Sequence, residues 1–302
     1  MTTAPARFSC APASAQRDDP LAGTATNVRT WVLLEHSGPW GRDALLDARL
    51  PDGLGPALKQ QAKAYRAKIL LVRRPQARRD PERLNVFVAH AHPRRPRIEH
   101  GTVGDLREVL DLDVTAFTAG GTTGLTSYDG SLFCVCTNGR HDACCAEYGR
   151  PVALALADAH PEETWEVSHV GGDRFAGNMV VLPEGLYYGR LDPQRAIGVA
   201  GAHLSGELDL DRLRGRSSYR MSVQAAEHVL RTRLGATRID DVALTGCTVD
   251  GELTTARFAI GAASYEVRVR TIVDPTSAAR LTCQALRDNP VPRHELVSVE
   301  RT

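Results

Sequence analysis

The feature that most constrains this chain is a cluster of cysteines followed by a short loop with two adjacent glycines. Four of the seven cysteines lie within twelve residues, at Cys134, Cys136, Cys144 and Cys145. The sequence His-Val-Gly-Gly-Asp, residues 169–173, then offers an imidazole and a carboxylate four positions apart. Thiolates, imidazoles and carboxylates are the side chains that bind transition metals. The pattern therefore indicates a metal site.

Composition narrows the class of protein. A chain of 302 residues is long enough for two or three domains. Its 37 basic and 36 acidic side chains give a net charge of +1, so we expect no nucleic-acid partner. No apolar run approaches the roughly 18 to 20 residues of a membrane span, so no membrane association is expected.

Cysteine usage and the N-terminus suggest the compartment. The first residues lack the basic region and apolar run of a signal peptide. Seven clustered cysteines differ from a disulfide framework spread along a secreted domain. We therefore expect a cytoplasmic protein in a reducing environment, where metal or redox chemistry is the leading use for these thiols.

Hydrophobic patterns divide the chain into four parts. Residues 1–27 are polar and predict a flexible arm, and residues 28–125 carry strand signals at 30–35, 67–72 and 83–89 that predict an α/β domain. Residues 130–205 form the second unit, and residues 206–302 predict a small α+β domain. No internal repeat is evident in the sequence.

The second unit has a characteristic order of elements. A strand at 131–136 leads into a helix at 142–159, an extended segment at 163–168, a hairpin at 178–190 and a helix from 192 to about 204. This order is that of the thioredoxin superfamily. The predicted fold class is thus α/β, with a thioredoxin-like cluster domain between the N-terminal α/β domain and the small C-terminal α+β domain.

These elements would bring the metal-binding side chains to one place. A strand that ends in Cys136 and a helix that begins near Cys144 and Cys145 put the sulfurs at one pole of the sheet. The amide groups of the helix N-terminus point there and favour thiolate over thiol. The glycine pair lets the backbone bend so that His169 and Asp173 can face one centre. Iron–sulfur clusters are held by thiolates, with histidine as an occasional ligand.

Several segments resemble the sucrase/ferredoxin-like family, whose members are related to thioredoxin-like [2Fe-2S] ferredoxins. The similar segments are residues 136–145, 165–178 and 182–190, with further likeness at 30–35, 38–41, 214–216, 224–227 and 281–283. Fungal members of this family bind the cluster through two cysteines and two histidines, the latter in a His-x-Gly-Gly-His loop. The resemblance thus implies a [2Fe-2S] protein that exchanges electrons with redox protein partners.

Carried over residue by residue, the resemblance implies the ligands. Cys136 and Cys145 match the two cysteines, and His169 matches the first histidine. The second histidine position is Asp173 here, so the fourth ligand is either this carboxylate or Cys144. The resemblance implies a one-electron carrier rather than a catalyst with its own substrate. No paired-carboxylate signature of a glycosidase supports the word sucrase in the family name.

Two other functions use the same residues. A thiol–disulfide redox enzyme would pair Cys136 with Cys144 or Cys145 and contain no iron. A structural zinc site would use the same ligands and make the chain a binding module.

Simpler roles exist for the neighbouring residues. We expect Cys134 to point to the opposite face from Cys136 and pack. His141 has two roles open to it, flanking the site or lying solvated at the helix start, and the second is expected. Asp142 is expected to cap the following helix. Asp173 has the alternative of pairing with Arg174 or Arg140. The other three cysteines are expected to be non-ligands, with Cys10 far from any core and free to oxidise; these are Cys10, Cys247 and Cys283.

Overall fold

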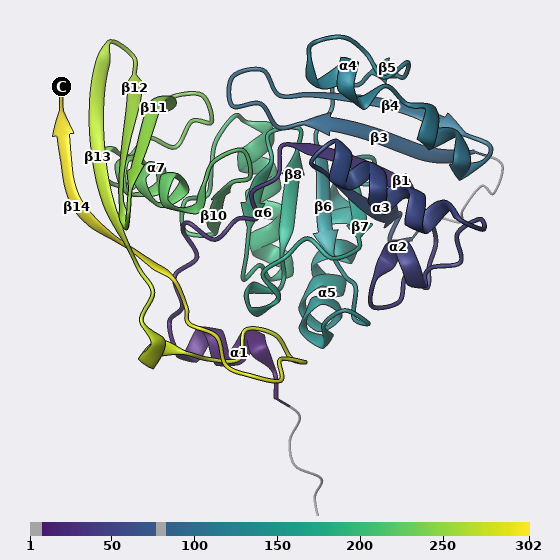
Figure 1. Ribbon diagram of the computed structural model, residues 1–302, viewed down its shortest axis with the longest axis horizontal. Coiled ribbons are helices and arrows are strands. Elements are labelled where there is room, and N and C mark those ends of the chain that lie inside the picture. Colours follow the sequence, from purple (N-terminus) through teal and green to yellow (C-terminus); the bar gives the residue numbers. More distant parts are fainter. Residues whose placement is uncertain (1–7, 77–82) are drawn as a thin grey trace, which may run out of the picture.

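The computed structural model describes residues 8–76 and 83–302 and has two β-sheets with helices packed against them (Figure 1). The mixed architecture confirms the predicted α/β class. Within the described ranges, none of the helices has the length and apolar composition that a membrane crossing requires.

The larger sheet contains ten strands. Their order is β10 (Leu213–Arg216), β9 (Leu186–Tyr188), β8 (Met179–Leu182), β6 (Leu132–Cys136), β7 (Thr164–Val167), β2 (Ala67–Arg73), β1 (Thr30–Glu35), β3 (Leu84–His90), β4 (Arg97–Val103) and β5 (Thr126–Ser127). The described α-helices are α1 (Cys10–Gln16), α2 (Ala44–Asp47), α3 (Leu54–Ala64), α4 (Val114–Thr118), α5 (Ala143–Ala159), α6 (Pro193–Leu204) and α7 (Met221–Leu234). Three short 3-10 helices are η1 (Leu106–Asp111), η2 (Asp173–Phe175) and η3 (Pro275–Ser277).

The large sheet contains the same topology twice. In one half β1 pairs with β2 in parallel across α3, and β3 and β4 follow as antiparallel neighbours. In the other half β6 pairs with β7 in parallel across α5, and β8 and β9 follow in the same way. The halves join where β2 and β7 run antiparallel, with Val72 opposite Val167. The two halves therefore repeat one order of strand pairing, although the sequence shows no internal repeat.

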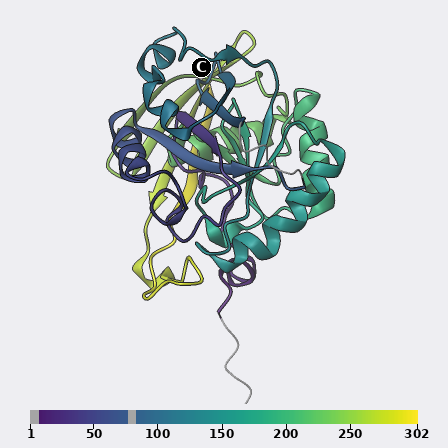
Figure 2. The ribbon, with the colours of Figure 1, turned by 90° about the vertical axis from the view of Figure 1, so that its right-hand side faces the viewer.

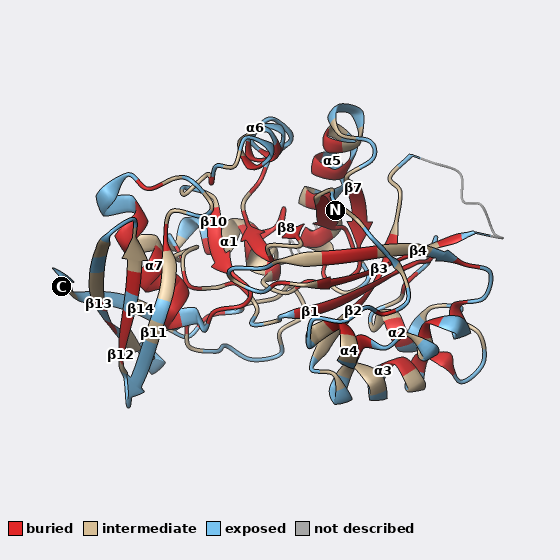
Figure 3. Ribbon diagram, turned by 90° about the horizontal axis from the view of Figure 1, so that it is seen from above, coloured by how far each residue is buried: buried red, intermediate tan, exposed pale blue. Residues whose placement is uncertain are grey.

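The sheet curls around a central apolar cluster. Trp31 of β1 and Tyr187 of β9 are separated by four strands in the sheet order, yet their ring centroids are 6.1 Å apart. Phe87 of β3 likewise meets Trp165 of β7 at 5.4 Å. Helices cover the outside, with α5 and α6 on one flank and α2, α3 and α4 on the other (Figure 3).

The C-terminal part forms its own sheet. Strands β11 (Ala243–Asp250), β12 (Leu253–Ile260), β13 (Ala263–Ile272) and β14 (Arg293–Arg301) pair in sequence order as an antiparallel sheet, and α7 packs against it. The segment between β13 and β14 returns to the other end of the molecule and lies beside α1 (Figures 1 and 2).

Most predicted elements occur, but the N-terminal arm differs. Residues 8–27 are packed on the protein: α1 begins at Cys10, which is fully buried, and Asp19 is also buried. The expected flexible arm is therefore wrong for residues 8–27, and its first seven residues lie outside the described part. The other domain boundaries remain predictions, while the large sheet is continuous across the one at 125–130.

Strands β4 and β10 were not predicted, because their sequences are strongly polar. Residues 97–103 form β4, which precedes the 3-10 helix η1. Residues 213–216 form β10, which contains two buried arginines. Arg216 pairs with buried Glu227, which also accepts a hydrogen bond from Arg231. Paired charges can be buried where unpaired ones cannot, so this ion pair joins β10 to α7 inside the protein.

One close contact fixes α5 against the end of β6. A Cβ atom on Gly149 would lie 2.1 Å from the carbonyl oxygen of Cys136. Only glycine allows the helix to approach the strand this closely. This contact places the first turn of α5 beside the last residue of β6.

We expect Gly149→Ala to lower the free energy of unfolding by about 1–3 kcal/mol, because the added methyl group forces helix and strand apart. Gly198→Ala is the matched control: it lies in α6, and its Cβ atom would meet nothing within 4 Å. That variant should gain about 0.5–1 kcal/mol. Chemical denaturation measures both, and equal effects would contradict this account of the α5 contact.

Candidate metal centre

Three predicted ligands converge at the junction of β6 and α5. Cys136 is the last residue of β6, and Cys145 lies in the first turn of α5; both are about 1% exposed. The donor atoms of Cys136, Cys145 and His169 all lie within 4.8 Å of one another. Side chains from a strand, a helix and a loop thus surround one point.

The loop after β7 delivers the remaining donors. Gly171 and Gly172 have φ angles of +107° and +81°, which L side chains rarely adopt. The turn brings Oδ1 of Asp173 to 3.0 Å from Nδ1 of His169 and within hydrogen-bond reach of the Cys145 thiol, at 3.3 Å. Asp173 is 3% exposed. The predicted bend therefore turns both side chains toward the cysteines.

Hydrogen bonds among the four donor side chains shift their pKa values. A hydrogen bond from Cys145 lowers the pKa of Cys136 well below its usual value, and His169 adds to the effect. The same hydrogen bond raises the pKa of Cys145. Burial acts to lower the pKa of His169, but its contacts with Asp173 and Cys136 raise it to about 9. Burial opposes ionisation of Asp173, yet His169 holds its pKa below the usual value. The site thus favours anionic sulfur and oxygen.

Two cations, buried Arg214 and partly buried Lys68, balance this negative charge. Arg214 of β10 is 1% exposed and donates to the carbonyl oxygen of Gly171 at 3.0 Å and to Oδ1 of Asn178 at 2.8 Å. Burial lowers the pKa of Arg214 to about 10 and that of Lys68 to about 8, while Cys136 and Asp173 act to raise both. Both groups therefore remain largely protonated at neutral pH.

Arg214 also explains one glycine. A Cβ atom on Gly172 would lie 2.3 Å from Nη2 of Arg214. The guanidinium group thus fills the space that a side chain would need, and holds the loop from behind.

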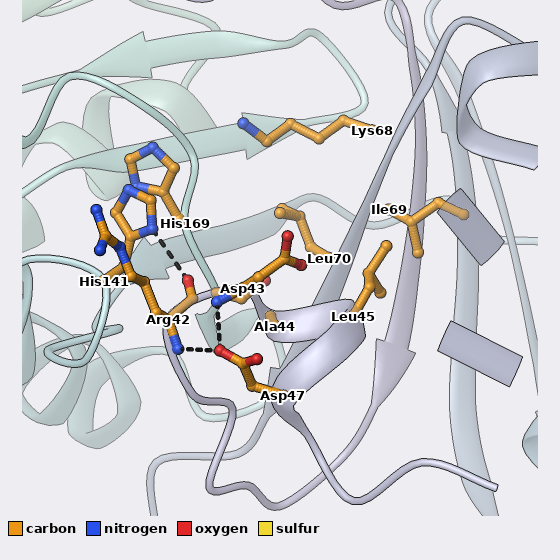
Figure 4. A pocket seen from close by; sticks show the side chains of 11 residues that line it. Arg42, Asp43, Ala44, Leu45, Asp47, Lys68, Ile69, Leu70, His141 and His169 are labelled. Atoms are coloured by element: carbon orange, nitrogen blue, oxygen red, sulfur yellow. Dashed lines mark hydrogen bonds between the residues drawn. The ribbon is translucent and has the colours of Figure 1, made fainter. Parts of the chain in front are cut away.

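A pocket opens beside the histidines. It has a volume of about 550 Å³, and its wall includes Arg42, Lys68, His141 and His169 (Figure 4). The His141 ring stacks on His169 with centroids 3.6 Å apart, and its Nδ1 atom lies 3.1 Å from the carbonyl oxygen of Arg42. The side chains of both histidines are about 30% exposed, at 29% and 27%. His141 therefore flanks the site, which was the alternative to the solvated position that the sequence favoured.

Cys144 points to a different place from Cys145. Its donor atom groups with those of three other residues rather than with Cys136. Hydrogen bonds, first from Cys10 and then from Ser9, lower the pKa of Cys144 to about 6. Asp142 caps α5 as predicted, by accepting from the backbone N–H of Cys144 at 2.9 Å.

Two smaller expectations need correction. Cys134 and Cys136 belong to the same apolar cluster, because side chains two positions apart on a strand share a face. The expected opposite orientation is therefore wrong. Burial alone raises the pKa of Cys134, in keeping with a packing role. Arg174 pairs with Asp19 at 3.5 Å instead of with Asp173.

The donor set fits a thiophilic metal group. Two thiols, an imidazole and a carboxylate face one buried region, and Nδ1 of His169 is buried without a hydrogen bond of suitable geometry. Sequence reasoning missed two residues at this site, Lys68 and Arg214. Of these two, only Arg214 had a signal, since it lies in one of the segments with family resemblance.

Comparison with known proteins agrees with that resemblance. A family model described as sucrase/ferredoxin-like matches residues 21–215, more than half of the chain. Neither a curated protein nor a solved structure matched the chain.

We expect Arg214→Met to lower the free energy of unfolding by about 3 kcal/mol or more. The change leaves several acceptors unpaired in the interior, each costing about 1–3 kcal/mol, and removes a cation from beside the donors. Arg220→Met removes the same charge from an exposed position nearby and should change stability by less than about 0.5 kcal/mol. Denaturant unfolding of the pair decides: similar losses would contradict a specific role for Arg214.

Proposed function

The chain belongs to the sucrase/ferredoxin-like family, and we propose that it is a [2Fe-2S] protein that carries single electrons between redox partners. The observation that carries this proposal is the convergence of Cys136, Cys145 and His169, with Asp173 beside them, in a buried site. A bound cluster would accept and release one electron at a time. The residues around it would bind it, set its charge and limit access of water.

Asp173 is the better candidate for the fourth ligand. It touches both His169 and Cys145, whereas Cys144 groups with a separate set of donors. Consecutive residues of a helix point about 100° apart, so Cys144 and Cys145 naturally face different surroundings.

The number of negatively charged ligands indicates where the reduction potential should lie relative to other [2Fe-2S] centres. Cys136, Cys145 and Asp173 with neutral His169 contribute three negative charges. A second histidine would leave two, and four cysteines would give four. Because a less negative site favours the reduced state, the potential should lie between those of all-cysteine and bis-histidine centres. The positive charges of Lys68 and Arg214 would raise the potential further.

Electrons would enter and leave at the histidine edge. Both cysteines are buried, while His169 and the stacked His141 reach the surface beside the pocket. This edge is the shortest route from the site to a docked partner. Arg42, Asp43 and Lys68 line the same opening and would contribute to partner selection (Figure 4).

A thiol–disulfide enzyme is the second candidate. The hydrogen bond between Cys136 and Cys145 is the observation that favours it, because a thiol beside a stabilised thiolate suits disulfide exchange. A structural zinc ion bound by the same residues is the third possibility. Visible absorption distinguishes them: a cluster gives a brown protein, while the disulfide and zinc forms are colourless.

We expect Cys136→Ser to abolish cluster binding, since it removes a thiolate ligand. Iron and sulfide analysis after anaerobic purification should show about two of each per chain in the wild type and almost none in the variant. Cys247→Ser is the control, because Cys247 is exposed on β11. Full iron content in Cys136→Ser would refute the proposed ligand set.

The fourth ligand has its own test. Asp173→His should keep the cluster and raise its potential, because a neutral ligand replaces an anion. His169→Cys should lower the potential for the opposite reason. Cys144→Ala should leave the visible spectrum nearly unchanged. Loss of the cluster in Cys144→Ala, with retention in Asp173→Ala, would reverse the assignment of the fourth ligand.

A further inference from the structure

A second group of metal-binding side chains lies on the other side of the first turn of α5. It contains three cysteines and one carboxylate whose donor atoms all lie within 4.8 Å of one another: Cys10, Asp142, Cys144 and Cys283. Cys10, Asp142 and Cys144 are fully buried, and Cys283 is partly buried. None of the four belongs to the ligand set proposed above.

The distances match one tetrahedral ion. The sulfur of Cys283 lies 3.4 Å from that of Cys144 and 3.6 Å from that of Cys10. Oδ1 of Asp142 lies 3.6 Å from the Cys10 sulfur. Zn–S bonds of about 2.3 Å at tetrahedral angles put ligand sulfurs about 3.8 Å apart, and a sulfur and an oxygen ligand about 3.5 Å apart. Little movement would therefore be needed to bind a metal.

Backbone N–H groups surround these side chains, as they commonly do around metal-bound thiolates. The backbone N–H groups of Cys10 and Ala11 lie 3.4 Å and 3.5 Å from the sulfurs of Cys283 and Cys144. The Asp142 carboxylate accepts from the N–H groups of Cys144 and Cys283, at 2.9 Å and 2.7 Å. Each carboxylate oxygen has a second lone pair, so Asp142 can keep these hydrogen bonds, which orient it, and still bind a cation.

The apolar cluster of this region is small. Its four buried residues are two cysteines and two alanines, with Phe8, Tyr148 and Cys283 partly buried against it. Residues 273–292, all of them described, have regular structure only at η3 and at one bridge between Ala279 and Asn289. Yet Cys10 and Cys283, which are 273 positions apart in sequence, come into contact here. A small apolar cluster contributes only part of the stability of this junction, and a metal ion bound by these side chains would add to it.

We propose that these four side chains form a second metal site that binds one Zn²⁺ ion and joins the N-terminal segment, α5 and the β13–β14 connection. Zn²⁺ fits because three thiolates and one carboxylate make a sulfur-rich tetrahedral set. All four coordination positions come from the protein, so the ion is structural. Its binding energy adds directly to folding.

The test is metal analysis of the full-length protein from cells supplied with iron and zinc. The wild type should contain about one zinc per chain in addition to iron. Cys283→Ser removes the most exposed ligand and should reduce zinc at least tenfold, with iron and the visible spectrum unchanged. It should also lower the melting temperature. The exposed-cysteine variant Cys247→Ser should retain both metals.

Three results would overturn the proposal: a wild-type protein without zinc, unchanged zinc in Cys283→Ser, or a fall in iron in that variant. A Cys144–Cys283 disulfide, found by mass spectrometry of alkylated peptides from the native protein, would also overturn it. If Cys283→Ser does not fold, the mass of the native wild-type protein still reports whether zinc is bound. Cys136→Ser should lose iron and keep zinc, so the zinc site stands or falls independently of the iron–sulfur proposal.

Discussion

The contact between Gly149 and the end of β6 is the constraint on which the rest of the site depends. A helix that follows a strand normally lies at a distance set by the side chains between them. Here no side chain intervenes, so α5 approaches until its backbone nearly touches the carbonyl group of Cys136. The first turn of the helix, with Asp142, Cys144 and Cys145, is thereby held beside the strand end. Both groups of metal-binding residues include members of this turn.

Burial of several acidic groups in one place requires compensation. Cys136 and Asp173 are almost fully buried, and unpaired charges in such a position would be costly. Arg214 provides positive charge from β10 and binds the glycine loop at the same time. Lys68 provides it from β2. Arg214 comes from β10 at the edge of the sheet and Lys68 from β2 in its middle. The curl of the sheet brings both side chains to the glycine loop.

The sequence predicted the strands, helix and turn that carry the site better than it predicted the segments packed around them. Hydrophobic periodicity predicts β6, α5 and β7, and the glycine pair predicts the turn that orients His169 and Asp173. These are local signals. The contact of Cys10 and Cys283 with Cys144 joins segments far apart in the chain, and no periodic pattern reports such proximity. Strand β10 has no local apolar signal either, because it contains two arginines whose partners lie on α7 and in the glycine loop.

Two adjacent cysteines on one helix give a physical reason for separate centres. Because neighbouring residues of a helix diverge by about 100°, one thiol faces the histidine loop and the other faces α1. A structural ion at Cys144 would fix the first turn of α5 from one side, and the proposed cluster at Cys145 would bind it from the other. The backbone of this turn would then move little when the cluster gained an electron. Such a rigid environment would keep the cost of rearrangement low, as the proposed electron carrier would require.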